Sequence, residues 1–196
     1  IFSFFTFVIA LVSACAFVFA PALLALLIPG LAHSPHAHEL LLLTRILLLQ
    51  PILLGISNIA ASVTQTYGRF ALYAVSPILY NLGIIVGIFF FYPRFGMVGL
   101  GFGVVFGALL HLLVQVPFLA REGLMPRLRF FFGSELRRVL ALSFPRTLAL
   151  SANQIALLVL TALASFMAPG SIAVFNFSFN LEAVPLSVIG LSYSVA

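Results

Sequence analysis

The residues that could carry chemistry in this chain are the polar side chains inside its long apolar stretches. An arginine at the centre of a membrane costs roughly 2.5–3.5 kcal/mol on insertion scales, so polar groups kept there are candidates for function. One set has spacings of four, three and four residues, which predicts a polar stripe on one helix face: Asn58, Ser62, Gln65 and Arg69. The stripe can line a water-filled cleft, or its members can hydrogen-bond to neighbouring helices. The spacing leaves both interpretations open.

A second set of polar residues lies near the end of the chain. Arg146 and Asn153 are seven residues apart, which places both on one helix face, and Asn176 and Asn180 share a face further on. Arg146 can reach lipid headgroups or bind an anionic cargo. Glu182 is the only carboxylate predicted inside an apolar segment, where it can bind a cation or a proton, or pair with Arg146. We treat this second set as candidates for a substrate-binding cleft.

The histidines have simpler explanations. His111 and Gln115 lie four residues apart in an apolar segment without a carboxylate to complete a proton relay, so we expect a neutral histidine bonded to a neighbouring helix. His33, His36 and His38 have no established metal-binding spacing, which favours a solvated loop. The chain has no Asp for a Ser–His–Asp triad, one cysteine and no phosphate-binding loop. We therefore expect no metal, no cofactor and no enzymatic activity.

Composition decides the class of protein. Hydrophobic residues make up 63% of the 196 residues and charged residues 7%, and the mean hydropathy is +1.26. Soluble domains are about 45–50% apolar and about 25% charged. These values exclude a soluble enzyme, a nucleic-acid-binding protein and a disordered tail. The apolar runs are continuous rather than alternating, which predicts an all-α integral membrane protein, a polytopic helical bundle.

Six apolar segments reach or approach the length of about 20 residues that a membrane span needs. They cover residues 2–28, 46–66, 70–92, 96–119, 139–167 and 172–196. We expect a kink at Pro21, and prolines inside four other segments favour a bundle that moves. Because the chain starts at Ile1 without methionine and stops at Ala196 inside an apolar run, we expect an internal part of a longer protein.

Glycine spacing predicts where helices approach each other. Gly83 and Gly87 are four residues apart in one segment, and Gly99, Gly103 and Gly107 repeat with the same interval in the next. Small residues at this interval let helix backbones pack closely in a membrane. We expect close helix contacts at these positions.

The arginine distribution predicts the orientation in the membrane. Loops at 67–69 and 120–138 hold six arginines, against two in the loops on the other side. The positive-inside rule then places residue 1 and the segment 121–138 in the cytoplasm, and the loop 29–45 outside.

The cytoplasmic segment 121–138 is basic and ends in an amphipathic stretch. Ser134 is predicted to cap a short helix, with Glu135 in its first turn and an apolar face that includes Leu136. Such a helix lies on the cytoplasmic leaflet, where anionic lipid attracts each arginine by about 1 kcal/mol. The arginines assigned to this membrane surface are Arg121, Arg127, Arg129, Arg137 and Arg138.

Several strings, in order, give the chain a family resemblance. They are TYGRFAL at 66–72, PILYNLGII at 77–85, GVVFGALLHLLVQVP at 103–117, RVLALSFPR at 138–146, Gln154, and APGSI at 168–172. With these strings the chain resembles the MurJ (MviN) lipid II flippases of the multidrug/oligosaccharidyl-lipid/polysaccharide exporter superfamily. The resemblance implies that the segments are the third to eighth helices of a larger two-lobed transporter. Residues 1–120 would belong to the first lobe, 121–138 to a connector and 139–196 to the second lobe.

The resemblance also implies a function. Members of the family move lipid-linked peptidoglycan precursor from the inner to the outer leaflet of the bacterial inner membrane by alternating access, and cationic residues in the cleft bind the pyrophosphate. The expected partners are this polyprenyl-linked substrate, membrane lipids and other cell-wall synthesis proteins, without nucleic acid. Where the family has Asn-Tyr-Ala-Asp-Arg-Leu, this chain has NFSFNL at 176–181, with Phe179 and Asn180 in place of Asp and Arg. A sibling exporter of another polyprenyl-linked oligosaccharide or of amphipathic drugs, and a non-transporting membrane scaffold, remain alternatives.

Overall fold

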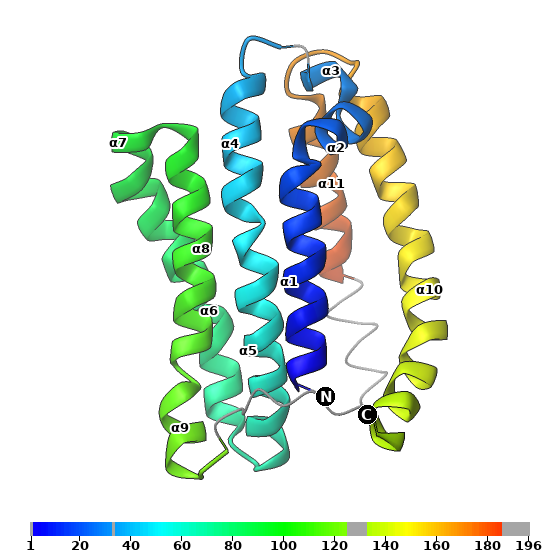
Figure 1. Ribbon diagram of the computed structural model, residues 1–196. Helices are drawn as coiled ribbons and strands as arrows, with labels where there is room; N and C mark the ends of the chain where they lie inside the picture. Colours follow the sequence, from blue (N-terminus) through cyan, green and yellow to red (C-terminus); the bar gives the residue numbers. More distant parts are fainter. Residues whose placement is uncertain (1, 33, 125–132, 186–196) are drawn as a thin grey trace. The chain divides into compact units, whose positions relative to one another are not determined.

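The computed structural model describes residues 2–32, 34–124 and 133–185 (Figure 1). Within these ranges the regular elements are all helices, which confirms the prediction of an all-α fold. In chain order they are α1 (Phe2–Val18), α2 (Ala20–Leu27), α3 (Pro29–Ala32), α4 (Ala37–Leu47), α5 (Leu49–Thr66), α6 (Phe70–Val86), the π-helix η1 (Gly87–Phe91), α7 (Tyr92–Phe95), α8 (Met97–Leu113), α9 (Val116–Arg121), α10 (Ser134–Ala164) and α11 (Ser171–Pro185).

Four helical stretches of the described chain are long and apolar enough to cross a membrane, and α1 and α2 form a bent pair that can count as a fifth span. The four are Ala37–Thr66, Phe70–Phe95, Met97–Arg121 and Leu136–Ala164. They confirm the polytopic architecture predicted from the apolar segments. The last predicted span, 172–196, is described only as far as Pro185 at the end of α11.

The second span begins at Ala37 rather than at residue 46, so the predicted loop 29–45 is wrong for most of its length. α4 and α5 are separated only by Leu48 and together form one span. The predicted span starts at residue 46, which leaves the charged residues Glu39 and Arg45 in the loop before it. Glu39, however, lies in the first turn of α4, where the helix dipole favours a carboxylate, and Arg45 lies in the last turn, where it favours a cation.

The break in the first span is at Phe19, not at the predicted Pro21. α1 ends at Val18, and α2 begins at Ala20 with Pro21 in its first turn, where the missing N–H of proline costs no helix hydrogen bond. The two helices are bent by 78° across this break. Pro21 therefore starts a new helix instead of kinking an existing one.

The chain folds into two compact units. The first contains residues 1–21 and 36–142, and the second contains residues 22–35 and 143–196. The assignment of the chain to two transporter lobes and a connector stays a prediction.

In the first unit α8 packs against α4, α5 and α6 (Figure 1). The predicted glycine contacts are confirmed: Gly83 faces Gly107 across the α6–α8 interface, and Gly87 faces Gly103. A Cβ built on Gly87 would lie 2.5 Å from the Cα of Gly103, so no side chain larger than hydrogen fits there. The backbones of an antiparallel helix pair touch along this line.

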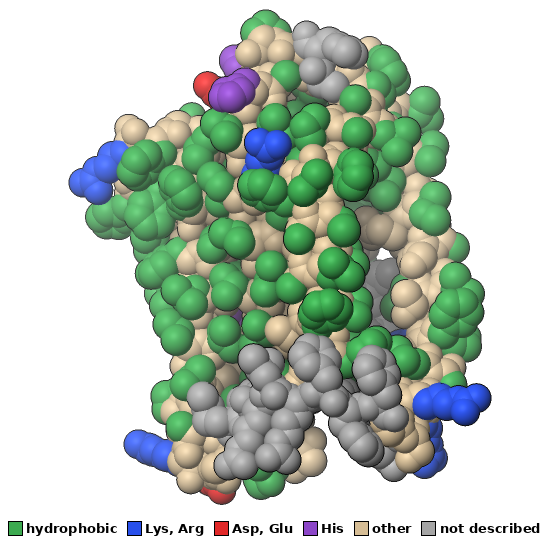
Figure 2. All heavy atoms as spheres, viewed as in Figure 1, with side chains coloured by type: hydrophobic (Ala, Val, Ile, Leu, Met, Phe, Trp, Pro, Cys, Tyr) green, Lys and Arg blue, Asp and Glu red, His purple; other side chains and the backbone are tan. Residues whose placement is uncertain are grey.

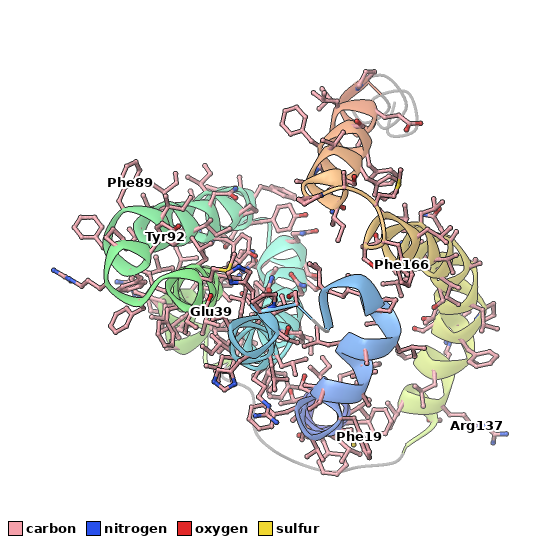
Figure 3. All side chains as sticks on the ribbon, turned by 90° about the horizontal axis from the view of Figure 1, so that it is seen from above. Phe19, Glu39, Phe89, Tyr92, Arg137 and Phe166 are labelled. Atoms are coloured by element: carbon pink, nitrogen blue, oxygen red, sulfur yellow. The ribbon has the colours of Figure 1, made fainter. Side chains whose placement is uncertain are left out.

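The outer side of this helix pair carries large apolar side chains. Phe89 on η1 points away from the pair and is 71% exposed (Figure 3). Figure 2 shows hydrophobic side chains covering the visible face of α4, α5 and α8. A surface of this kind is suited to contact with lipid.

The second unit contains α3, α11 and most of α10. The backbone N–H of Gly30 donates to Ser165 Oγ at 3.2 Å, and a Cβ at Gly30 would collide with the Ser165 carbonyl. The end of α10 and the start of α11 enclose an apolar hollow of about 520 Å³ that is lined by residues such as Leu163, Met167 and Val174.

The short surface helix predicted to begin at Ser134 is not separate. Ser134 is the first residue of α10, which runs without a break for 31 residues to Ala164. Pro145 lies inside α10 and does not end it. The amphipathic stretch therefore forms the first turns of a spanning helix rather than a helix of its own.

Candidate functional site

A buried polar cluster joins three helices of the first unit. Its members are Ser57 on α5, Ser76 on α6, His111 on α8 and Gln115 at the start of α9, and each is at least nine-tenths buried. Because buried polar groups are costly unless they are hydrogen-bonded, such a cluster needs internal partners.

The partners are supplied by the cluster itself. Ser57 Oγ lies 2.6 Å from His111 Nδ1 and donates to the His111 carbonyl at 3.0 Å. Gln115 Nε2 donates to Ser57 Oγ at 2.9 Å, and Ser76 Oγ donates to the Leu72 carbonyl at 2.8 Å. The prediction that His111 bonds to a neighbouring helix is confirmed.

The cluster holds helices together and is not suited to binding a charged cargo. None of its four side chains is a carboxylate, a lysine or an arginine. Gln115 Oε1 is buried and has no hydrogen-bond partner in the described part of the chain. The four-residue spacing points to His111 and Gln115 but not to Ser57 and Ser76, because only the helix packing brings these two serines to them.

The predicted polar stripe on α5 is only partly correct. Asn58 and Ser62 are exposed and Gln65 is half-buried, and together they follow one face of the helix. The buried residues, Ser57, Ala60, Ala61 and Thr64, form the adjoining face. Among described residues no stripe side chain on α5 bonds to another helix; Ser62 Oγ donates to the carbonyl of Asn58 on its own helix. This side of α5 is therefore exposed at Asn58 and Ser62 in the described chain.

Arg69 does not belong to this helix face, which corrects the prediction. α5 ends at Thr66, and Gly68 takes a left-handed conformation with φ of 70°. The N–H groups of Gly68 and Arg69 then donate to the carbonyls of Gln65 and Thr64, both at 2.9 Å. This is the Schellman arrangement, which terminates a helix and turns the chain away from its axis.

Arg69 instead lies at a hollow near the end of the first unit. Its guanidinium carbon is 5.7 Å from the centre of the Phe118 ring. Arg69, Arg121 and Glu122 line a space of about 380 Å³ beside this ring. Two cations from separate turns are thus placed at one end of the helices, where lipid headgroups are expected.

The cleft candidates of the second unit are all exposed on helices. Arg146 and Asn153 lie on α10, and Asn176, Asn180 and Glu182 lie on α11. Asn176 Nδ2 donates to the Ile172 carbonyl of its own helix at 3.0 Å. Between the described side chains of Arg146 and Glu182 there is no ion pair, so the suggested pairing is not observed. These five side chains are therefore exposed and do not form one cluster.

The remaining candidates are surface residues. Arg121, Arg137 and Arg138 are exposed, and Arg137 points away from α10 (Figure 3). Arg127, Arg129 and His33 lie outside the described residues. His36 and His38 are exposed at the start of α4, and no group of three metal-binding side chains occurs in the part of the chain that is described.

Comparison with known proteins decides the family. The profile of the family described as "Lipid II flippase MurJ" matches residues 1–196. The chain belongs to the MurJ family. The match agrees with the resemblance carried by the sequence strings and extends over every span described above.

Named members of the MurJ family are similar to this chain at a moderate level. A protein of Buchnera aphidicola from Acyrthosiphon pisum, named "Probable lipid II flippase MurJ", is 30% identical over 182 residues, which is 90% of this chain and 35% of the relative. The "Lipid II flippase MurJ" of Burkholderia cenocepacia is 30% identical over 76% of this chain and 30% of its own length. A Haemophilus influenzae relative is 31% identical over 69% of this chain and 27% of its own length. The chain thus spans about a third of the MurJ relatives it matches.

Proposed function

We propose that the complete protein moves lipid II from the inner to the outer leaflet of a bacterial inner membrane, for cell-wall synthesis. The observation that carries the proposal is the family match over residues 1–196, together with relatives that are named lipid II flippases. In this proposal the protein is a transporter rather than an enzyme, and this chain forms part of the transport path.

The open polar faces of the spanning helices support a transport path. Asn58 and Ser62 on α5 and Arg146 and Asn153 on α10 are exposed, although α5 and α10 are otherwise apolar helices of membrane-spanning length. Polar and ionisable groups are expensive against lipid tails and usually face a bundle interior or a water-filled cavity. In the complete protein these faces would line the cleft that the cargo crosses.

Arg146 is the residue of this chain best suited to the pyrophosphate of the cargo. A guanidinium binds phosphate oxygens with two parallel hydrogen bonds, and it stays charged at every physiological pH. Asn180 stands where the family has arginine, and its amide can still donate to a sugar or phosphate oxygen. Further cations would come from parts of the protein outside this chain.

The rigid pairing of α6 and α8 supports a mechanism in which whole groups of helices move together. Gly83 and Gly87 bring the backbones of this pair into contact, so the pair is expected to move as one body. Alternating access in many transporters is rocking of one such body against another. We propose that residues 1–120 and 139–196 belong to two lobes that move in this way, joined by 121–138.

We also propose an orientation. Six arginines lie in the loops 67–69 and 120–138, which the positive-inside rule assigns to the cytoplasm together with residue 1. The residues that precede the Ala37–Thr66 span then face outside. Membrane lipids are the expected neighbours of the apolar faces, and cell-wall synthesis proteins are candidate partners.

The proposal is tested by expressing the full-length gene in bacteria depleted of their own lipid II flippase and measuring growth. A fluorescent fusion at the C-terminus shows whether the protein is folded and inserted. We expect growth to be restored. Failure by a folded, inserted protein would contradict the proposal and favour another polyprenyl-linked cargo, an amphipathic drug or a scaffold role.

A further inference from the structure

Arg45 is a cation on the α4–α5 span and is not one of the proposed transport residues. It follows the start of the Ala37–Thr66 span by eight residues, or about 12 Å along the helix. The span has 30 residues and is about 45 Å long, against a hydrocarbon thickness of about 30 Å. If the excess is shared between the two ends, Arg45 is attached roughly 5 Å below the hydrocarbon surface, and its side chain reaches the headgroups.

The guanidinium of Arg45 lacks the partner that a charge at this depth needs. Its central carbon lies 5.0 Å from the centre of the Phe17 ring on α1, which orients it by a cation–π contact. Its Nε atom is buried and has no hydrogen-bond partner in the described part of the chain. No described carboxylate forms an ion pair with it. The Nε–H donor is thus buried with no acceptor in the described part of the chain.

A groove lies beside this guanidinium. It encloses about 320 Å³ between α1 and the α4–α5 junction and is lined by Ala14 and Phe17 on one side and by Leu48 and Ile52 on the other. Arg45 is the only charged residue in its wall. The groove therefore combines an apolar channel with one cation near its headgroup end.

We propose that this groove binds an anionic phospholipid of the surrounding bilayer. The phosphate accepts hydrogen bonds from Arg45, and one acyl chain lies between α1 and the α4–α5 junction. Arginine matches phosphate oxygens in a bidentate manner, and the bond gains strength because the site is partly removed from water. A single guanidinium balances the single negative charge of a phosphodiester, whereas a pyrophosphate carries more charge than this site offers.

The consequence is a lipid that fastens α1 to the α4–α5 span. The lipid would supply the acceptors that Arg45 lacks and fill the space between the two helices. This role is independent of the proposed transport activity, because it concerns a bilayer lipid that stays bound rather than a cargo that crosses.

The test measures lipid retention by native mass spectrometry of the full-length protein, with phosphatidylglycerol titrated against a background of phosphatidylcholine. We expect wild type to retain phosphatidylglycerol preferentially and Arg45→Gln to bind it about tenfold more weakly, which corresponds to the loss of one charge-assisted hydrogen bond. Arg94→Gln, at an exposed arginine of α7 that lines no described groove, is the matched control and should bind as wild type does.

A second variant keeps the test decisive if Arg45→Gln fails to fold. Ala14→Leu fills the groove while Arg45 stays in place, and it should also lose the bound phosphatidylglycerol. Equal retention by wild type and either variant would overturn the proposal, as would equal retention of phosphatidylcholine. Displacement of the bound lipid by an equal concentration of polyprenyl pyrophosphate would assign the groove to a transport substrate and overturn it as well.

Discussion

Gly87 of η1 and Gly103 of α8 meet backbone to backbone, with only 2.5 Å between the Cα of Gly103 and the place where a Cβ of Gly87 would be. Gly83 and Gly107 repeat the contact one turn away. In a membrane, where lipid tails are as apolar as leucine, helices associate through close packing of this kind rather than through the hydrophobic effect. The α6–α8 pair is therefore held by direct backbone contact.

A bulkier residue in this contact should destabilise the protein. We expect Gly103→Val to lower the free energy of unfolding by about 1–3 kcal/mol, because the facing backbone must move apart. Ala74→Val, at an exposed position of α6, adds methyl groups without this collision and is the control. Thermal unfolding of the full-length protein in detergent measures both. Equal melting temperatures for the two variants would show that the helices do not pack at the glycines.

The Ser57 hydroxyl is the hub of the buried polar cluster, since it contacts both His111 and Gln115. Ser57→Ala should lower the free energy of unfolding by about 1–3 kcal/mol because it leaves buried donors without an acceptor. Ser62→Ala lies on the adjoining, exposed face of α5 and should change it by less than about 0.5 kcal/mol. Both are measured in the same unfolding assay, and a larger effect at Ser62 would refute the assignment.

Arg146 is proposed to bind the pyrophosphate of the cargo, and its side chain is exposed in the described chain. Arg146→Gln should abolish or strongly reduce growth rescue in flippase-depleted cells without changing the melting temperature. Arg138→Gln removes an exposed arginine two turns earlier on α10 and should leave rescue intact. A loss of rescue that is equal in both variants would mean that the net positive charge of α10, not a site, is what matters.

Asn180 stands in place of the family arginine on α11. If its amide donates to the cargo, Asn180→Ala should slow transport by about tenfold, the effect of one good hydrogen bond, and Asn180→Arg should preserve transport. Transport is measured as the rate at which lipid II reaches the outer leaflet. Wild-type transport by Asn180→Ala would remove this residue from the path.

The proposed orientation predicts which positions a membrane-impermeant maleimide reaches in intact cells. In a Cys15→Ser background, His36→Cys at the start of α4 should react, and Arg121→Cys at the end of α9 should react only after the cells are permeabilised. Permeabilised cells serve as the control for reactivity at both sites. The reverse pattern would invert the orientation derived from the arginine counts.

The sequence was sufficient to predict the features that depend on local pattern. Continuous apolar runs predicted spanning helices, because the length of a span is set by the thickness of the bilayer. The interval of four between Gly83 and Gly87 predicted a close helix contact, since residues four apart share a helix face. The register, with Gly83 opposite Gly107, came only from the structure because spacing within one helix does not fix its partner.

The errors have local physical causes. Arg69 was placed on the α5 face because the four-residue spacing continues, but the left-handed Gly68 ends the helix before it. The apolar run begins at residue 46, after Arg45, but the helix begins at Ala37 because Glu39 and Arg45 fit the two ends of α4. Ser57 and Ser76 were missed because single serines in apolar helices commonly bond to their own backbone, and only packing brings them to Gln115.

The appearance of lipid II on the outer leaflet is the direct measure of whether the full-length protein is a lipid II flippase. Cells depleted of their own flippase would express the full-length protein and be treated with an enzyme that degrades lipid II but cannot cross the membrane. We predict that degradation products appear with wild type and are strongly reduced with Arg146→Gln at equal expression. Lipid II that stays protected in cells with a folded, inserted wild-type protein would contradict it.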